Sequence, residues 1–244
     1  MKRIQGVVSR FCDFKKEFVF FVHDSADLIQ GHHLNGQLYE IEELRLIREH
    51  SVGARVFVDI GANVGNHAIF MAKVLGAQKV YAFEANPSTA EILKLNVLLN
   101  NVAHTVDTSH VGMGLGDRIG TFRVEYPQRN NIGAARLVEE EAPGTQAIAE
   151  EHAAARVMVC PFDSLSLAEE PQFVKIDVEG MEMSVLRGMA GAIEKFRPPM
   201  LIEVDNGNFD LFDEWMGRND YVEVARFKRY AQNENFLIKH RSAV

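Results

Sequence analysis

The chain has 244 residues, 47% of them hydrophobic and 25% charged, with a formal net charge of -8. This composition is typical of a globular protein with a full core, and the negative charge argues against a general nucleic-acid-binding protein, which needs a basic face. No apolar run approaches the roughly 18 residues of a membrane helix, and the start lacks the pattern of a signal peptide. The only cysteines are Cys12 and Cys160, so we expect a reducing, cytoplasmic compartment.

Residues 1–52 are predicted to form an N-terminal extension to the core. Within it, the apolar run 18–22 predicts a strand, and apolar residues at helical spacing predict a helix from Tyr39 to His50. His32 and His33 are neighbours in a predicted loop without a third ligand. We therefore interpret them as solvated side chains and predict no metal ligands in this chain.

The most informative stretch is a predicted strand, turn and helix over residues 55–67. A short apolar run predicts a strand buried on both faces, and a helical pattern begins at His67. The turn between them contains Gly61 and Gly65, and glycine lets the backbone approach a ligand closely. These parts are typical of a nucleotide-binding unit, although an ordinary strand-to-helix turn also contains glycine. Asp59, at the strand end, can orient the turn or bind a ligand ammonium group.

A second strand is predicted at 79–84, and it ends on a carboxylate. Glu84 lies 19 positions after Gly65, where a nucleotide-binding α/β fold places an acid on the ribose hydroxyls. A carboxylate can accept two hydrogen bonds from a vicinal diol, and the alternative is a solvated acid at a strand end. The pair Asn86-Pro87 then predicts a capped helix with proline at its first position.

The regular alternation of strands and helices weakens after this helix. A third strand is predicted within 105–113, and Gly112-Met113-Gly114 is predicted to end it level with an adenine ring. Residues 121–124 predict one arm of a hairpin. The remainder of an insertion at about 117–156 is polar, and we interpret it as either a lid or a disordered segment.

The alternation resumes at 173–180 and continues to the end of the chain. Strands are predicted at 173–180 and 200–204, with a C-terminal antiparallel hairpin at 221–225 and 235–239. The series predicts one α/β domain, with a core over 53–244, a mainly parallel sheet and helices on both faces. Ligands in such sheets bind beyond the carboxyl ends of the strands. The acids predicted at that edge are Asp59, Glu84, Asp177 and Glu203.

Four blocks of sequence carry a family resemblance. They are VDIGANVGNH at 58–67, YAFEANP at 81–87, VKIDVEGME at 174–182 and LIEV at 201–204. Together they resemble the FkbM family of S-adenosylmethionine (SAM)-dependent methyltransferases over about residues 38–240. The resemblance implies a class I methyltransferase (Rossmann-like) fold with a seven-stranded sheet, SAM as the cofactor, and methylation of a hydroxyl group.

The resemblance also implies roles for particular residues. The segment 59–66 would hold the methionine end of SAM, Glu84 its ribose, and Asp177 would face the methyl-transfer centre. The predicted cofactor contacts are Asp59, Gly61, Ala62, Asn63, Gly65, Asn66, His67, Glu84, Ala85, Asn86, Met113 and Gly114.

Methyl transfer to an alcohol needs a positioned acceptor and a base. The candidate catalytic residues are Asp177, Glu179 and Glu203. We interpret His67 as a structural or cofactor contact, because a helix N-terminus disfavours imidazolium. Two alternatives stay open beside these roles: Glu179 as a helix N-terminal charge, and Lys175 as the counter-ion of a buried acid.

Two other functions share much of this pattern. An NAD-dependent dehydrogenase also uses a glycine turn followed by an acid, but here Asn63 and Asn66 occupy the second and third glycine positions of its motif. A non-catalytic SAM-binding protein would have the same features, because a fold does not fix a function. We therefore predict a methyltransferase acting on a hydroxyl of a small molecule, sugar or lipid, with no nucleic-acid partner.

Overall fold

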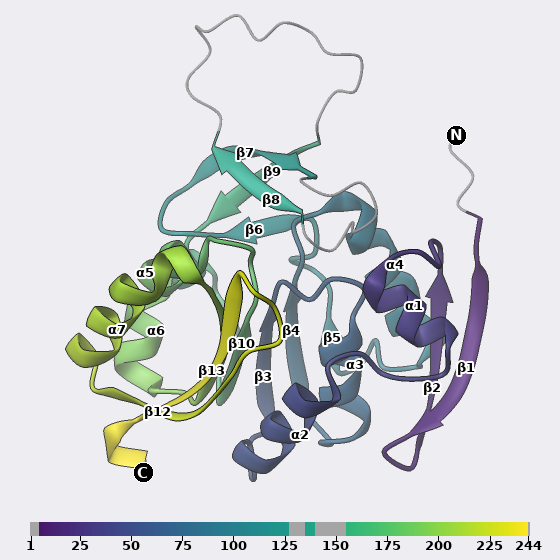
Figure 1. The fold of residues 1–244 in the computed structure, drawn as a ribbon, viewed down its shortest axis with the longest axis horizontal. Helices are drawn as coiled ribbons and strands as arrows, with labels where there is room; N and C mark the ends of the chain where they lie inside the picture. Colours follow the sequence, from purple (N-terminus) through teal and green to yellow (C-terminus); the bar gives the residue numbers. More distant parts are fainter. Residues whose placement is uncertain (1–4, 127–134, 140–154, 244) are drawn as a thin grey trace, which may run out of the picture.

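A computed structural model describes residues 5–126, 135–139 and 155–243 (Figure 1). Its central sheet contains β3 (Val56–Ile60), β4 (Lys79–Phe83), β5 (Val106–Asp107), β10 (Phe173–Ile176), β11 (Met200–Asp205), β12 (Tyr221–Phe227) and β13 (Asn233–His240). The spatial order is β12-β13-β11-β10-β3-β4-β5. Neighbours from β11 to β5 are parallel, whereas β13 is antiparallel to both β11 and β12. The predicted seven-stranded sheet and its antiparallel edge hairpin are confirmed.

Helices cover both faces of this sheet. One face packs against α5 (Glu182–Gly188), α6 (Ala190–Phe196) and α7 (Phe209–Arg218). The other packs against α2 (Ile41–His50), α3 (Asn66–Lys73) and α4 (Pro87–Leu99). Because strand side chains alternate between faces, Val58 joins the first core and Phe57 the second. Within the described ranges, no helix combines the length and apolar character that crossing a bilayer requires.

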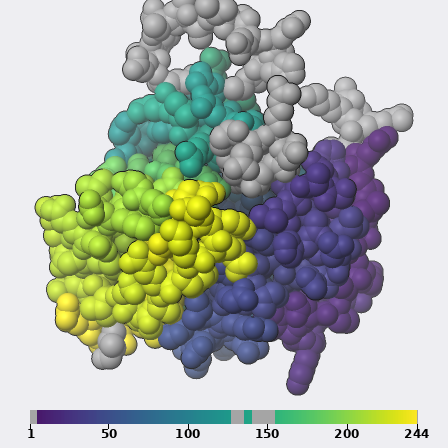
Figure 2. Space-filling view, viewed as in Figure 1, coloured from purple at the N-terminus to yellow at the C-terminus, as the bar shows by residue number. Residues whose placement is uncertain are grey.

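The N-terminal extension packs against the glycine turn and the C-terminal strands. It contains the antiparallel hairpin β1 (Val7–Asp13) and β2 (Lys16–Val22), followed by α1 (Leu28–Leu34) and α2. Arg229, between β12 and β13, donates from Nε to Glu43 of α2 at 2.8 Å. In Figure 2 the yellow C-terminal segment accordingly lies beside the purple N-terminal one. These contacts support the single domain, which stays a prediction.

The histidine pair lies in the last turn of α1 rather than in a loop. His33 is fully buried and stacks on Phe20, with ring centroids 3.8 Å apart. Its Nε2 lies 3.0 Å from Oδ1 of Asn66. Burial lowers the pKa of His33 to about 4, so the ring is neutral. The interpretation of His33 as a solvated side chain is therefore wrong.

A second sheet covers the carboxyl ends of the central strands (Figure 1). It consists of β6 (Met113–Leu115), β9 (Arg156–Cys160), β7 (Gly120–Glu125) and β8 (Arg136–Glu139), in that spatial order. The predicted hairpin arm at 121–124 is confirmed, since β7 pairs antiparallel with β8. Phe122 and Val124 on β7 are buried, whereas their neighbours along the strand are more exposed. The polar side chains of β7 therefore belong to the more exposed face of this sheet.

One prediction for this region needs correction, and another stays a prediction. The third strand of the central sheet is only the two-residue β5, and Met113 begins β6, which pairs with β9 of the second sheet. The described residues of the insertion at about 117–156 form strands, which leaves the lid interpretation as a prediction, and 127–134 and 140–154 lie outside the described residues. The remaining short helices are η2 (Phe162–Ser164), η3 (Asn206–Asn208) and η4 (Arg241–Ala243).

Candidate active site

A cavity of about 540 Å³ lies between the carboxyl ends of the parallel strands and the second sheet. Its walls come from the turn after β3, the end of β4, strands β6 and β8, the segment after β10, and β11. This volume is within the range of small-molecule sites, and its place is where open α/β sheets bind ligands. The cavity is therefore the candidate site.

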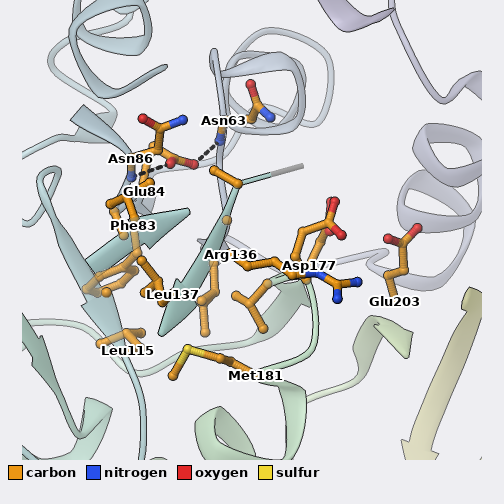
Figure 3. Close-up of a pocket in the computed structure, with 18 of the residues that line it drawn as sticks. Asn63, Phe83, Glu84, Asn86, Leu115, Arg136, Leu137, Asp177, Met181 and Glu203 are labelled. Carbon is orange, nitrogen blue, oxygen red and sulfur yellow. Dashed lines mark hydrogen bonds between the residues drawn. The ribbon is translucent and has the colours of Figure 1, made fainter. Parts of the chain in front are cut away.

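The structure brings many of the predicted residues together at this cavity. The predicted cofactor contacts that line it are Gly61, Asn63, Glu84, Ala85, Asn86, Met113 and Gly114. The three predicted catalytic acids, Asp177, Glu179 and Glu203, line it as well. Figure 3 shows Glu84 between Asn63 and Asn86 on one side, with Asp177 and Glu203 on the other.

Glu84 is fixed at the cavity wall by two backbone donors. Its Oε2 accepts from the N–H of Asn63 at 2.7 Å, and its Oε1 accepts from the N–H of Asn86 at 2.8 Å. Burial raises the pKa of the carboxyl group, and the two N–H donors oppose that shift. Glu84 is thus not a solvated acid. Each oxygen of a carboxylate retains a second acceptor position, so a ligand diol can still be bound.

Five other predicted cofactor contacts lie behind the turn and do not line the cavity. They are Asp59, Ala62, Gly65, Asn66 and His67. Asp59 is fully buried because it lies on the helix-covered face of β3 that Phe57 also occupies. Asn66 exchanges two hydrogen bonds with the backbone of Tyr39, at 3.0 and 2.9 Å. These side chains support the turn from inside the protein.

His67 is also buried, with Nε2 3.6 Å from the carboxylate of Glu40. Burial and the nearby Lys175 and Arg229 lower its pKa well below the ordinary value. The ring is therefore a neutral interior group, which agrees with a structural contact and not with a side-chain contact in the cavity.

Lys175 provides a positive charge beneath the acidic end of the cavity. Its Nζ lies 3.0 Å from Oδ2 of Asp177 and 3.7 Å from Oδ1 of Asp59, and it donates to the carbonyl of Gly61 at 3.0 Å. Lys175 is buried, and the nearby acids raise its pKa although burial opposes this. The interpretation of Lys175 as a counter-ion of buried acid is confirmed.

The three candidate catalytic acids form one cluster. Oxygens of Asp177, Glu179 and Glu203 lie within 4.8 Å of one another. Glu203 accepts from Nδ2 of Asn233 at 2.7 Å and from Nδ2 of Asn235 at 3.4 Å. Burial, with the neighbouring acids, raises the pKa of Glu179 to about 8 and also raises that of Glu203. Glu179 has φ of +49°, a left-handed conformation that side chains rarely adopt.

Several residues of the cavity were missed by sequence reasoning. They include Tyr39, Arg136, Met181, Tyr230 and Asn233. Only the asparagines of β13 carried a usable signal, because Asn233 and Asn235 repeat at a spacing of two and so share a sheet face. The other residues come from segments that meet only in the folded chain.

The close packing of the turn predicts a large cost for a side chain at Gly61. Gly61 has φ of +78°, and a Cβ there would lie 1.7 Å from the carbonyl oxygen of Asp177. Gly76 is a matched control with φ of +68° and nothing within 4 Å of its Cβ position. We expect Gly76→Ala to cost about 1–2 kcal/mol through its conformation alone, and Gly61→Ala at least about 3 kcal/mol. Urea unfolding measures both, and equal losses would contradict this packing.

Comparison with known proteins identifies the family. Residues 59–227 match the Methyltransferase FkbM domain. The chain belongs to the FkbM methyltransferase family. It is 29% identical over 147 residues to Methyltransferase 1 of Beauveria bassiana, covering 54% of this chain and 57% of that protein. It is 29% identical over 158 residues to hexuronic acid methyltransferase AglP of Haloferax volcanii, covering 64% of this chain and 58% of that protein.

This FkbM-family chain therefore spans less than two thirds of those relatives. Its fold is similar to that of the M. jannaschii tRNA m1G37 methyltransferase, with a TM-score of 0.54 and 15% identity over 96% of this chain and 55% of the other. It is also similar to the Pyrococcus abyssi tRNA (uracil-54, C5)-methyltransferase in complex with S-adenosyl-L-homocysteine, with a TM-score of 0.50 and 14% identity over 96% and 44%. These likenesses show the class I, Rossmann-like methyltransferase fold.

Proposed function

We propose that this FkbM-family chain is a SAM-dependent methyltransferase that methylates a hydroxyl group of a small molecule, sugar or lipid. The observation that carries the proposal is the arrangement of one cavity. A fixed carboxylate suited to a ribose lies on one side, and a cluster of three carboxylates suited to an acceptor lies on the other. The family membership and the fold support this assignment.

The residues that line the cavity fit the three parts of SAM: its ribose, its adenine and its positively charged methionine end. Glu84 offers free acceptor positions to the ribose hydroxyls. Gly114 lets Leu137 pack closely against β6 in the cavity wall, since a Cβ there would lie 2.8 Å from Leu137. Leu115, Leu137 and Met181 give an apolar surface suited to adenine (Figure 3). The negative cluster favours a cationic ligand. When bound, SAM supplies a methyl group on a positively charged sulfur.

The residues of the chain would position the acceptor and take its proton. An alcohol that becomes an ether loses the proton of its hydroxyl group. Asp177, Glu179 and Glu203 are the carboxylates of the cavity that are close enough together to share one acceptor hydroxyl. Burying the hydroxyl beside them aligns it and provides a base, and base assistance typically contributes about 100- to 10,000-fold.

A sugar acid is the acceptor class to test first. The relative AglP is described as a hexuronic acid methyltransferase. The cavity also presents Arg136, Tyr230 and Gln232, whose side chains can hydrogen-bond to hydroxyl and carboxylate groups. The exclusion of a nucleic-acid partner rests on net charge and stays a prediction.

The function is tested by turnover. The chain is incubated with SAM and either hexuronic acid glycosides, simple glycosides, hydroxylated lipids or tRNA, and S-adenosylhomocysteine is measured. We expect release to depend on a hydroxylated acceptor, with a product heavier by one methylene group at an oxygen atom. Methylation of tRNA, or of nitrogen or carbon, would contradict the proposed acceptor. Binding of SAM without turnover on any acceptor would favour the non-catalytic alternative.

A further inference from the structure

The acidic cluster crowds three carboxyl groups together, and its nearby cations are Lys175 and Arg136. Asp177 and Glu179 follow β10, and Glu203 lies on the adjacent β11, so the pairing of the two strands brings the three acids together. Lys175 contacts Asp177. No residue in the described part of the chain donates a hydrogen bond to the carboxylate of Glu179. Among the described residues, the hydrogen-bond donors to the carboxylate of Glu203 are the neutral amides of Asn233 and Asn235.

Asn233 provides a second, independent observation at this place. Its side chain is 5% exposed and lines the same cavity. The nitrogen of its amide donates to Glu203 at 2.7 Å, whereas the amide oxygen is buried without a hydrogen-bond partner. Because both atoms are bonded to one carbon, the unpaired oxygen lies beside the cluster. Buried acceptors are rarely left unpaired, so this oxygen is available to bind a ligand beside the cluster.

We propose that Asp177, Glu179, Glu203 and the amide oxygen of Asn233 bind one divalent cation of the Mg²⁺ or Mn²⁺ class. Such cations prefer carboxylate and amide oxygens, and they keep some positions for water or substrate oxygens. A cation would balance the cluster and also satisfy the orphaned oxygen. A ligand ammonium group has three N–H donors, one fewer than the four oxygen-bearing groups of this cluster, whereas one cation can bind all four.

This site departs from the prediction of no metal ligands. The ligands come from three separate segments, so no ligand spacing marks them in the sequence. Its role in the reaction rests on the proposed function: a hydroxyl oxygen bound to the cation would lose its proton more easily and would be held in place. Binding of the cation itself is independent of that function.

The test is a titration of the full chain, freed of metal with a chelator, with MnCl2 in the absence of SAM. Free Mn²⁺ is followed by electron paramagnetic resonance. We expect one saturable site that Mg²⁺ competes for. Glu179→Gln and Asn233→Ala should each weaken binding at least about 10-fold. The control Glu170→Gln, an exposed acid outside this cavity, should not.

Two further readouts separate the possible outcomes. Melting curves show whether each variant is folded, and two variants in separate segments, the turn after β10 and strand β13, protect the test against one failing to fold. Calorimetry with SAM on the same samples tests the proposed function separately. If the chain binds SAM but shows no saturable Mn²⁺ site, the cation site alone is overturned. The same holds if Glu179→Gln and Asn233→Ala both bind Mn²⁺ with the affinity of the unmodified chain.

Discussion

The variant Asp177→Asn is expected to lose about 100- to 10,000-fold in turnover, with little change in SAM affinity. Asp177 lies at the acidic end of the cavity, and asparagine keeps its size while removing its charge. An interaction with the proton of the acceptor strengthens in the transition state, so its loss lowers turnover rather than ground-state binding. The expectation is the same if Asp177 acts through the proposed cation. Turnover and calorimetry on the purified variant measure the two quantities.

The alternative is a structural role for Asp177, because it forms an ion pair with Lys175 at 3.0 Å. Lys175 would keep the carbonyl of Gly61 and the carboxylate of Asp59 as partners in the variant. Asp117 is a matched control: it is 24% exposed against 27% for Asp177, pairs with Arg187 at 3.0 Å, and does not line the cavity. Asp117→Asn should therefore keep its turnover. If Asp177→Asn shows a large drop in melting temperature but near-normal turnover per folded molecule, the catalytic role of Asp177 is contradicted.

The variant Glu84→Ala should weaken SAM binding by about 1.5–3 kcal/mol, which is the usual contribution of hydrogen bonds to a charged group. This corresponds to roughly 10- to 150-fold in affinity. The carboxylate also holds the N–H groups of Asn63 and Asn86, so alanine would loosen the wall as well.

Glu84→Gln separates these two effects, because its amide oxygen can still accept one of the backbone bonds. Calorimetry with SAM on both variants, and on Glu91→Ala as an exposed acid of α4, gives the comparison. Unchanged affinity in both Glu84 variants would remove Glu84 from the cofactor site and leave it as a structural support of the turn.

Local signals predicted the elements that position the cofactor side of the cavity. The apolar run of β3, the glycines of its turn and the cap at Asn86-Pro87 each depend on neighbouring residues only, and the structure contains all of them. The acids at the strand ends could be placed for the same reason: parallel strands in one sheet end at one edge.

Contacts between distant segments explain what could not be predicted. Met113 begins a separate strand because β6 pairs with β9, more than 40 residues later. Asn66 points into the interior because Tyr39 of the N-terminal extension pairs with it. Asn233 reaches Glu203 because β13 inserts between β11 and β12. The spacing of Asn233 and Asn235 indicates a shared sheet face, but no local pattern identifies the distant partner in any of these pairings.

The most direct test of the central claim is a thermal melt of the chain with SAM, S-adenosylhomocysteine, NAD or no ligand. A ligand at about 100 times its dissociation constant adds roughly 2.7 kcal/mol to the free energy of unfolding, which for a chain of this size is about 5–10 °C. The account predicts that shift with SAM and with S-adenosylhomocysteine, and none with NAD. A shift with NAD and none with the other two would contradict it.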